Sequence, residues 1–202
     1  MLYLLPGMGA TSGMYSGSWL NLDKVVFVDW PDMDLPFTLG EVATALIKKH
    51  KIRPEDIVGG SSLGGIISLE IGSQLQSKQV ILIGSAISRT EVNAFLRMIA
   101  PMAKITPFSL IQLLAASSGV LGKMFSQTDS EFIRQSCKQI NQWQGCQIDL
   151  SKVHRIHGSK DHIISCPDDC KIIKNGGHLI AMTHAKECVE FIQNVLGTEP
   201  VV

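Results

Sequence analysis

The sequence predicts an α/β fold, with a mostly parallel sheet of about six strands, flanking helices and a helical segment inserted between two strands. Short apolar runs recur along the chain, and helical patterns lie between them. Strands of a parallel sheet are apolar almost throughout because helices cover both of their faces. The alternation of strand and helix therefore favours the α/β class, and a length of 202 residues suits a single domain.

Six apolar runs are expected to form the strands; they span residues 2–5, 25–30, 56–60, 79–84, 153–158 and 170–174. Helical patterns occupy residues 38–50, 63–75 and 184–196. The first of these opens with Thr38 as the N-cap and has Glu41 three residues later, which is the spacing of a capping box. The last ends at Gly197, a residue type that favours a helix stop.

The stretch from about 88 to 145 interrupts this alternation, because it contains helical patterns and no convincing strand. The patterns cover residues 90–105, 107–118 and 129–143. A helical insertion between two parallel strands is most simply a cap over the carboxyl edge of the sheet, where open α/β folds bind ligands. We therefore expect one domain over 1–202 with a helical lid at about 88–145.

Composition and charge argue against several classes of function. Lys plus Arg equals Asp plus Glu at 18 each, so no broad basic field favours nucleic acid. The five cysteines are irregularly spaced, which favours reduced thiols over a metal site or a disulfide framework. No uncharged apolar run reaches the roughly 18 residues of a membrane span, and the first residues lack the basic region of a signal peptide. We expect a cytoplasmic protein that binds no metal and does not span a membrane.

The stretch VGGSSLGGI fits the pattern G-x-S-x-G with Ser62 at its centre. Centring the pattern on Ser61 would put Leu63 where the second glycine belongs, so Ser62 is the expected nucleophile. An expected strand precedes the motif and an expected helix follows it, as in proteins that hold a nucleophile on a strained, sharp turn. The residues two before and two after the serine approach closely on such a turn, which requires glycine at 60 and 64.

Two other interpretations of this stretch are a phosphate-binding loop and a plain Gly/Ser turn. Glycines before a helix bind phosphates in dinucleotide-binding folds. The stretch lacks G-x-G-x-x-G, however, and no lysine follows in the Walker A position. The motif alone leaves the plain turn open, so the choice depends on partner residues elsewhere in the chain.

A serine hydroxyl needs a base, and the base needs an orienting acid; for this motif the chain order is serine, acid, histidine. Asp161 fits the acid because it lies in the turn after the strand expected at 153–158, although a turn aspartate that binds backbone N–H groups is an alternative. His178 fits the base because it lies in a Gly-rich loop between the last strand and the final helix. The residues that fit these positions less well are Asp149, Asp168, Asp169, His50, His154, His157, His162 and His184.

Two backbone N–H groups are expected to form an oxyanion hole. Leu63 follows the serine at a helix N-terminus, where backbone N–H groups have no partner within the helix. The second donor should come from the loop after the first strand. Met8, between Gly7 and Gly9, is the candidate there, and a simple glycine turn is the alternative.

These segments make the sequence similar to the α/β-hydrolase superfamily over nearly the whole chain. The resemblance is carried by LLPGMG as the oxyanion strand and loop, GSSLGG as the nucleophile turn, HGSKDHII as the acid turn and NGGHL as the histidine loop. It implies a catalytic triad of Ser62, Asp161 and His178. It also implies that the Met8 and Leu63 amides form the oxyanion hole and that the helical insertion forms a lid.

The sequence departs from the superfamily pattern in two ways. Members often have His-Gly before the oxyanion residue, whereas this chain has Pro6-Gly7. The antiparallel strands that usually come first are missing, so we expect about six strands, all parallel. The exposed edge of such a sheet could be covered by a second copy of the chain, which would make the protein a homo-oligomer.

The expected function is hydrolysis of a small-molecule ester or thioester through an acyl-enzyme, without a metal or organic cofactor. An acyltransferase, a lyase or a cofactor-free peroxidase could use the same triad, and a non-catalytic binding protein on this fold is a further class. An apolar lid favours a substrate with an acyl or other apolar group, although packing of the lid on the core would also explain its composition. The apolar lid residues are Phe95, Met98, Ile99, Met102, Phe108, Leu110, Leu113, Leu114, Met124 and Phe125.

Overall fold

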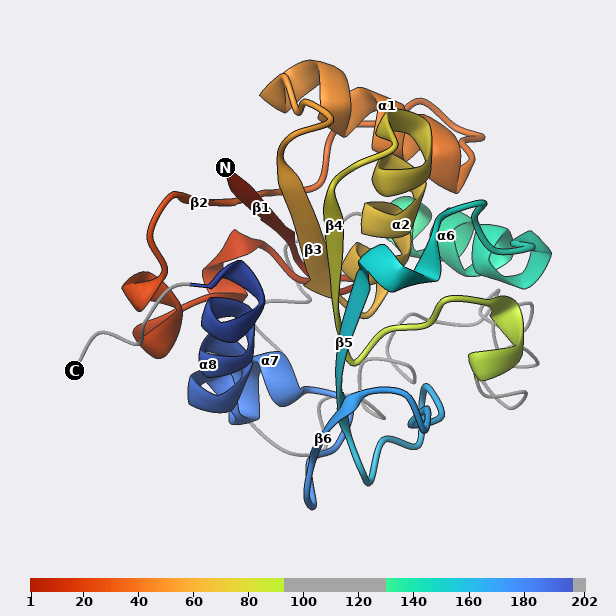
Figure 1. Ribbon diagram of the computed structural model, residues 1–202. Coiled ribbons are helices and arrows are strands. Elements are labelled where there is room, and N and C mark those ends of the chain that lie inside the picture. The colour runs from red at the N-terminus through yellow and green to blue at the C-terminus, as the bar shows by residue number, and fades with distance from the viewer. Residues whose placement is uncertain (93–129, 198–202) are drawn as a thin grey trace.

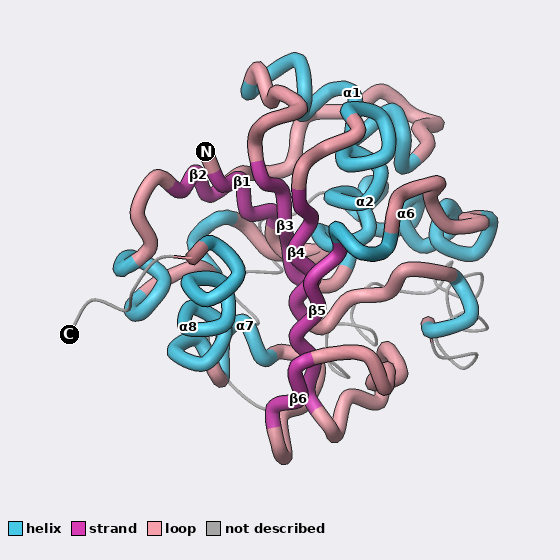
Figure 2. Tube along the Cα trace, viewed as in Figure 1, coloured by secondary structure: helices cyan, strands magenta, loops and turns pink. Residues whose placement is uncertain are grey.

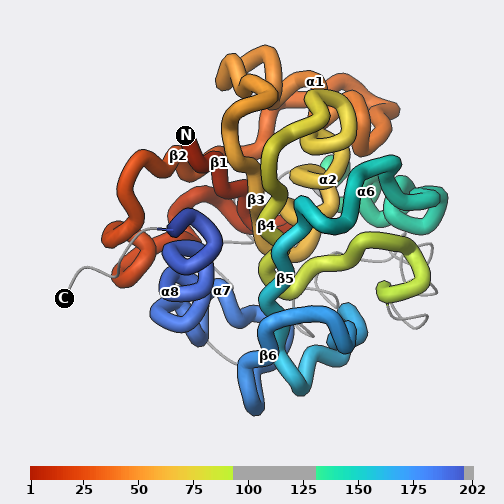
Figure 3. Tube along the Cα trace, viewed as in Figure 1, coloured from red at the N-terminus to blue at the C-terminus, as the bar shows by residue number. Residues whose placement is uncertain are grey.

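A six-stranded parallel sheet forms the centre of the computed structural model, which describes residues 1–92 and 130–197 (Figures 1 and 2). The strand order is β2-β1-β3-β4-β5-β6, and every described pairing between neighbours is parallel. The strands are β1 (Leu2–Leu5), β2 (Val25–Phe27), β3 (Ile57–Ser61), β4 (Gln79–Ile83), β5 (Val153–Gly158) and β6 (Lys171–Ile173). The first strand in the chain lies inside the sheet, beside β3, as the red and orange segments of Figure 3 show.

All six predicted strands form, and the fold class predicted from the sequence is confirmed. The strand predicted at 25–30 is shorter than expected, since β2 ends at Phe27. The residues after it turn toward the loop that follows β1. Asp29 accepts hydrogen bonds from the backbone and side chain of Ser12, and the Trp30 indole donates to the Gly7 carbonyl.

Helices cover both faces of the sheet (Figure 1). On one face lie α1 (Leu39–His50), α2 (Leu63–Leu75) and α6 (Ser130–Gln142), and on the other lie α7 (Ile180–Thr183), α8 (Ala185–Leu196) and the short 3-10 helix η2 (Gly17–Asn21). Alternate side chains of each strand enter the two cores. In β4, for example, Val80 and Leu82 pack toward α1 and α2, whereas Ile81 and Ile83 pack toward α7 and α8. Burial on both faces explains why these strands are apolar throughout.

The predicted capping box at the start of α1 is confirmed. The Thr38 hydroxyl accepts from the Glu41 backbone N–H at 3.2 Å, and the Glu41 carboxylate accepts from the Thr38 backbone N–H at 2.7 Å. The last turn of α1 is basic, with Lys48, Lys49 and His50, which suits the negative end of the helix dipole.

The insertion between β4 and β5 is described only at its two ends. A 3-10 turn, η3 (Arg89–Glu91), begins it, and α6 falls within the helix predicted at 129–143. The guanidinium of Arg155 on β5 binds both carboxylate oxygens of Glu91 and so fixes the start of the insertion to the sheet. Residues 93–129 lie outside the described part of the chain, and with them lie all ten apolar residues assigned to the lid.

Within residues 1–92 and 130–197, no helix is long and apolar enough to cross a membrane. In the same ranges, no three His, Cys, Asp or Glu side chains are grouped so that they could hold a metal ion.

Candidate active site

A sharp turn between β3 and α2 carries Ser62. Its backbone dihedral angles are φ 52° and ψ −118°, and a positive φ is strained for a residue other than glycine. A methyl group on Gly60 would lie 2.5 Å from the Gly64 carbonyl carbon. One on Gly64 would collide with the carbonyl oxygens of Leu5 and Pro6. The predicted steric need for glycine two residues before and two residues after Ser62 is therefore confirmed.

The Ser62 hydroxyl is not used to cap the helix that it precedes. A serine at the N-cap commonly accepts a hydrogen bond from a backbone N–H of the first turn, but Ser62 forms no such bond. Its Oγ lies 2.9 Å from Nε2 of His178 instead. The Ser62 backbone is held from the neighbouring strand, because its N–H donates to the Ile83 carbonyl and its carbonyl accepts from the Ser85 hydroxyl at 2.7 Å. The hydroxyl is therefore presented to the histidine on a fixed backbone.

Two loops at the carboxyl ends of β5 and β6 bring the predicted acid and base together. Asp161 follows β5 and His178 follows β6, and the loops are joined by a hydrogen bond from the Lys160 N–H to the Gly176 carbonyl at 2.8 Å. Nδ1 of His178 lies 2.8 Å from Oδ2 of Asp161. An ionised carboxylate only accepts, so Nδ1 carries the proton and Nε2 is left to accept one from Ser62.

The Asp161 carboxylate is fully buried and accepts hydrogen bonds at both oxygens. Oδ1 accepts from the backbone N–H groups of Ile163 and Ile164 at 2.8 and 3.0 Å. Oδ2 lies 2.8 Å from a ring nitrogen of His178 and 3.0 Å from one of His157. Burial by itself would raise the pKa of Asp161, but the hydrogen bonds from His157, His178 and the backbone outweigh it and hold the pKa well below its usual range. The acid is therefore ionised at neutral pH.

The sequence interpretation does not include His157 in this network, because the residue lies in the strand expected at 153–158. Its side chain is 1% exposed, and Nε2 lies 3.0 Å from both Asp161 Oδ2 and the Ile164 carbonyl oxygen. Both of these atoms are acceptors, so Nε2 of His157 carries a proton and donates it to them. The available signal was the spacing in HGSKD, where a histidine at the end of a strand stands four residues before the acid.

Both predicted oxyanion donors belong to segments that lie next to Ser62. Leu63 begins α2 directly after the serine. A methyl group on Gly7 would lie 3.9 Å from Ser62 Cβ, so the loop that carries Met8 passes beside the serine. Among the residues that the structure describes, neither the Met8 nor the Leu63 N–H has a hydrogen-bond acceptor. Their role as oxyanion donors stays a prediction.

The other acidic candidates lie elsewhere. Asp149 caps a 3-10 turn by accepting from the Ser151 N–H at 3.0 Å. Asp169 lies 3.3 Å from the Arg155 guanidinium, and Asp168 is exposed on the same loop. Of the candidate acids, Asp161 is the one that contacts His178 in the described structure.

Comparison with solved structures finds proteins with a similar fold. A hydrolase from Oleispira antarctica is similar, with a TM-score of 0.78, 16% sequence identity and coverage of 98% of this chain and 91% of that one. An esterase from Thermogutta terrifontis has a TM-score of 0.73 and 15% identity, over 97% of this chain and 89% of that one. An alpha/beta hydrolase fold protein from Burkholderia ambifaria has a TM-score of 0.69 and 16% identity, over 96% and 89%.

The chain has the α/β-hydrolase fold. Neither a protein-family model nor a curated protein sequence matches it, so the likeness rests on the course of the backbone. In this α/β-hydrolase fold, Ser62, Asp161 and His178 follow β3, β5 and β6. Carboxyl ends of parallel strands lie at one edge of the sheet, which is where open α/β folds bind ligands.

Proposed function

We propose that the protein is a serine hydrolase that cleaves a carboxylic ester or thioester, with Ser62 as nucleophile, His178 as base and Asp161 as orienting acid. The observation that carries the proposal is an unbroken chain of hydrogen bonds. It runs from Ser62 Oγ to His178 Nε2 at 2.9 Å and from His178 Nδ1 to Asp161 Oδ2 at 2.8 Å. The esterase from Thermogutta terrifontis, which has a similar fold, is consistent with this class of reaction.

The proposed reaction has two acyl-transfer steps. His178 Nε2 takes the Ser62 proton as Oγ attacks the carbonyl carbon, and the resulting imidazolium gives that proton to the leaving alcohol or thiol. A water molecule then takes the place of the leaving group, gives its proton to Nε2 and attacks the acyl-enzyme, which frees the acid and restores Ser62. Asp161 holds the imidazole in the required tautomer and stabilises its charged form.

The backbone N–H groups of Leu63 and Met8 are proposed to stabilise the negative charge that develops on the carbonyl oxygen in both steps. A preorganised donor of this kind commonly contributes about 3–4 kcal/mol to the lowering of the barrier. The loop that carries Met8 is held in place without involving that N–H. The Tyr15 hydroxyl donates to the Leu5 carbonyl at 2.5 Å, and the Trp30 indole donates to the Gly7 carbonyl at 3.3 Å.

The insertion at about 88–145 is proposed to act as a lid over this edge of the sheet. Its described part supports the proposal, because α6 lies against the oxyanion loop. The Cys137 sulfur on α6 is 3.6 Å from the Met8 sulfur. Phe132 on the same helix stacks at a tilt against Trp30, with ring centroids 5.3 Å apart.

Labelling with an alkyl fluorophosphonate tests the nucleophile. The reagent phosphonylates an activated serine and releases fluoride, and we expect one adduct on the native protein, located at Ser62 by peptide mass spectrometry. Protein unfolded in urea should not react, because the adduct requires the assembled triad. Absence of an adduct at Ser62 in the folded protein would rule out the proposed mechanism.

Replacing His157 with phenylalanine is expected to lower kcat about tenfold or more at nearly unchanged KM, because a hydrogen bond to a charged acid is worth roughly 1.5–3 kcal/mol. His157 touches the acid and not the substrate, so it acts as a positioning residue. His157→Gln can still donate an N–H to Asp161 and should recover part of the rate toward p-nitrophenyl hexanoate. An equal loss in both variants would indicate that His157 only fills space.

A further inference from the structure

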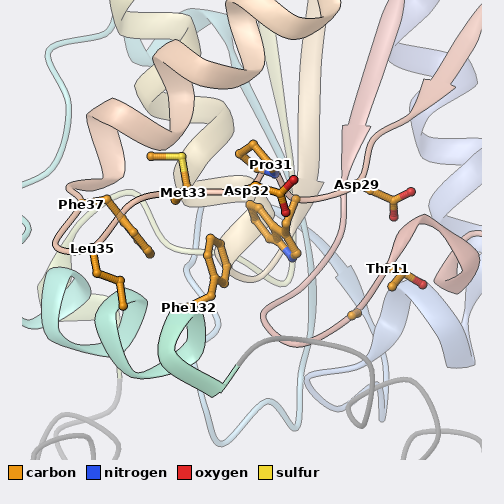
Figure 4. A pocket seen from close by; sticks show the side chains of 10 residues that line it. Thr11, Asp29, Pro31, Asp32, Met33, Leu35, Phe37 and Phe132 are labelled. Atoms are coloured by element: carbon orange, nitrogen blue, oxygen red, sulfur yellow. The ribbon is translucent and has the colours of Figure 1, made fainter.

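A pocket of about 450 Å³ opens beside the oxyanion loop, on the β1 and β2 side of the site (Figure 4). Its apolar lining includes Trp30, Met33, Phe37 and Phe132, and its acidic residues are Asp29 and Asp32. Figure 4 shows Phe37, Met33 and Phe132 gathered on one side and Asp29 on the other, with Asp32 between them. The residues come from the loop after β2 and from α6, which are far apart in the sequence.

This pocket is connected to the candidate nucleophile through the oxyanion loop. The Trp30 indole N–H donates to the Gly7 carbonyl at 3.3 Å, and Gly7 lies next to Ser62. Ala10 and Thr11, which follow on the same loop, line the pocket directly. Ser62 itself is not among the lining residues, so a substrate whose carbonyl carbon is held at Ser62 would reach this pocket by extending past the oxyanion loop.

The position of His178 indicates which half of the substrate would enter. His178 must protonate the leaving group, so the leaving group lies on the side of His178. In the sheet order, β6, which precedes His178, lies at one edge, and β1 and β2 lie beyond β3 at the other. Along the sheet, the loops after β1 and β2 that supply most of the lining follow strands on the other side of β3 from β6, and we expect the acyl group of the acyl-enzyme on that side.

The pocket lining combines aromatic side chains with two acidic residues. The rings of Trp30 and Phe132 have centroids 5.3 Å apart, and those of Phe37 and Phe132 are 5.1 Å apart, so they form one continuous apolar surface. The Asp32 carboxylate is exposed, and no described residue forms an ion pair or hydrogen bond with it. Among the described residues that line the pocket, none is Lys or Arg. Such a pocket attracts apolar and cationic groups and repels anionic ones.

We propose that this pocket binds the acyl group of the substrate and selects acyl chains that are neutral or cationic at their far end over anionic chains. The selection rests on the proposed function, because it concerns the acyl side of the same serine. The apolar part of the acyl chain would pack against the aromatic residues of the pocket. The charged end of the chain would interact with the Asp32 carboxylate, which attracts a cation and repels an anion.

Three p-nitrophenyl esters with one leaving group and one chain length test this selection. Their acyl groups are hexanoate, adipate as its anionic monoester and ω-trimethylammonio hexanoate. We expect kcat/KM for the adipate ester to be about tenfold or more below that for hexanoate at low salt, and the gap to narrow as salt screens the charges. We expect kcat/KM for the cationic ester to be clearly higher than kcat/KM for the adipate ester, because the two esters have charged ends of opposite sign.

The variant Asp32→Asn tests the role of Asp32, because it removes the negative charge of this side chain. It should raise kcat/KM for the adipate ester several-fold relative to kcat/KM for the hexanoate ester, and Asp32→Lys should raise this ratio more strongly. Asp34→Asn and Asp34→Lys are the matched controls, because Asp34 is exposed on the same loop but does not line the pocket. An equal gain from the Asp34 variants would show that net charge is responsible and would overturn the proposal.

A second readout separates failure of the pocket from failure of the proposed function. Fluorophosphonates with matching neutral and anionic tails should phosphonylate Ser62 at different rates, in the same order as the esters. Labelling and ester hydrolysis without charge discrimination would overturn the pocket assignment and leave the hydrolase intact. Absence of any reaction at Ser62 would overturn both.

Discussion

Ser62→Ala is expected to lower kcat for ester hydrolysis by at least about a thousandfold, because loss of the nucleophile in a serine triad removes most of the catalysis. Oγ of Ser62 is the atom that would form the acyl-enzyme, and it is the serine oxygen that hydrogen-bonds to His178. The fold should tolerate the change. The side chain makes no helix-capping bond, and alanine keeps the Cβ and the backbone hydrogen bonds that hold the turn.

Ser61→Ala is the matched control for this variant. Ser61 is the adjacent serine, lies in β3 and is buried, with 2% of its surface exposed. It should keep at least about a third of the wild-type rate, since it lies outside the hydrogen-bonded chain to Asp161 and a small substitution typically shifts stability rather than chemistry. Rates measured with p-nitrophenyl hexanoate, together with matched circular dichroism spectra, decide the comparison. A large loss in Ser61→Ala with activity retained in Ser62→Ala would contradict the choice of frame for the motif.

Features that depend on residues close together in the chain could be predicted from the sequence. Strands buried on both faces are apolar throughout, and the runs at 2–5 and 153–158 form strands with those bounds. The choice of Ser62 over Ser61 was also local in the sequence, because only the frame centred on Ser62 has glycine both two residues before and two residues after the serine. The contacts that require these glycines also involve the carbonyl groups of Leu5 and Pro6 at the end of β1. The capping box is local as well, because Thr38 and Glu41 satisfy each other's backbone N–H groups.

Contacts between distant segments could not be predicted in the same way. His157 contacts Asp161 because β5 ends at Gly158 and the following turn folds the acid back toward the strand, which depends on three-dimensional geometry. β2 ends early because Asp29 and Trp30 bind a loop some twenty residues before them in the chain. The pocket beside the oxyanion loop combines residues near position 30 with Phe132 and has no signature in any one segment.

Asp161→Asn is expected to lower kcat by about ten-thousandfold, the effect known for loss of the acid in a serine triad. The hydrogen bonds explain why asparagine cannot replace this acid. Both carboxylate oxygens face N–H donors, with two backbone groups at Oδ1 and two imidazoles at Oδ2. Asparagine has a single oxygen, so in either orientation its NH₂ group faces two other donors. Either His178 loses its orientation or the loop that carries residue 161 shifts.

The same substitution should destabilise the protein at neutral pH and much less in acid. The folded-state pKa of Asp161 lies below its unfolded value of about 3.9, so its stabilising effect is present above that pH and is lost as the pH falls toward the folded-state pKa. Urea unfolding of wild type and Asp161→Asn should therefore differ most at neutral pH. The difference should be smaller at about pH 3 and should narrow further as the pH falls toward the folded-state pKa of Asp161. Asp168→Asn, an exposed aspartate on the same loop, is the control and should match wild type at both. A difference between wild type and Asp161→Asn that stays constant with pH would show that the ionised carboxylate does not stabilise the folded site.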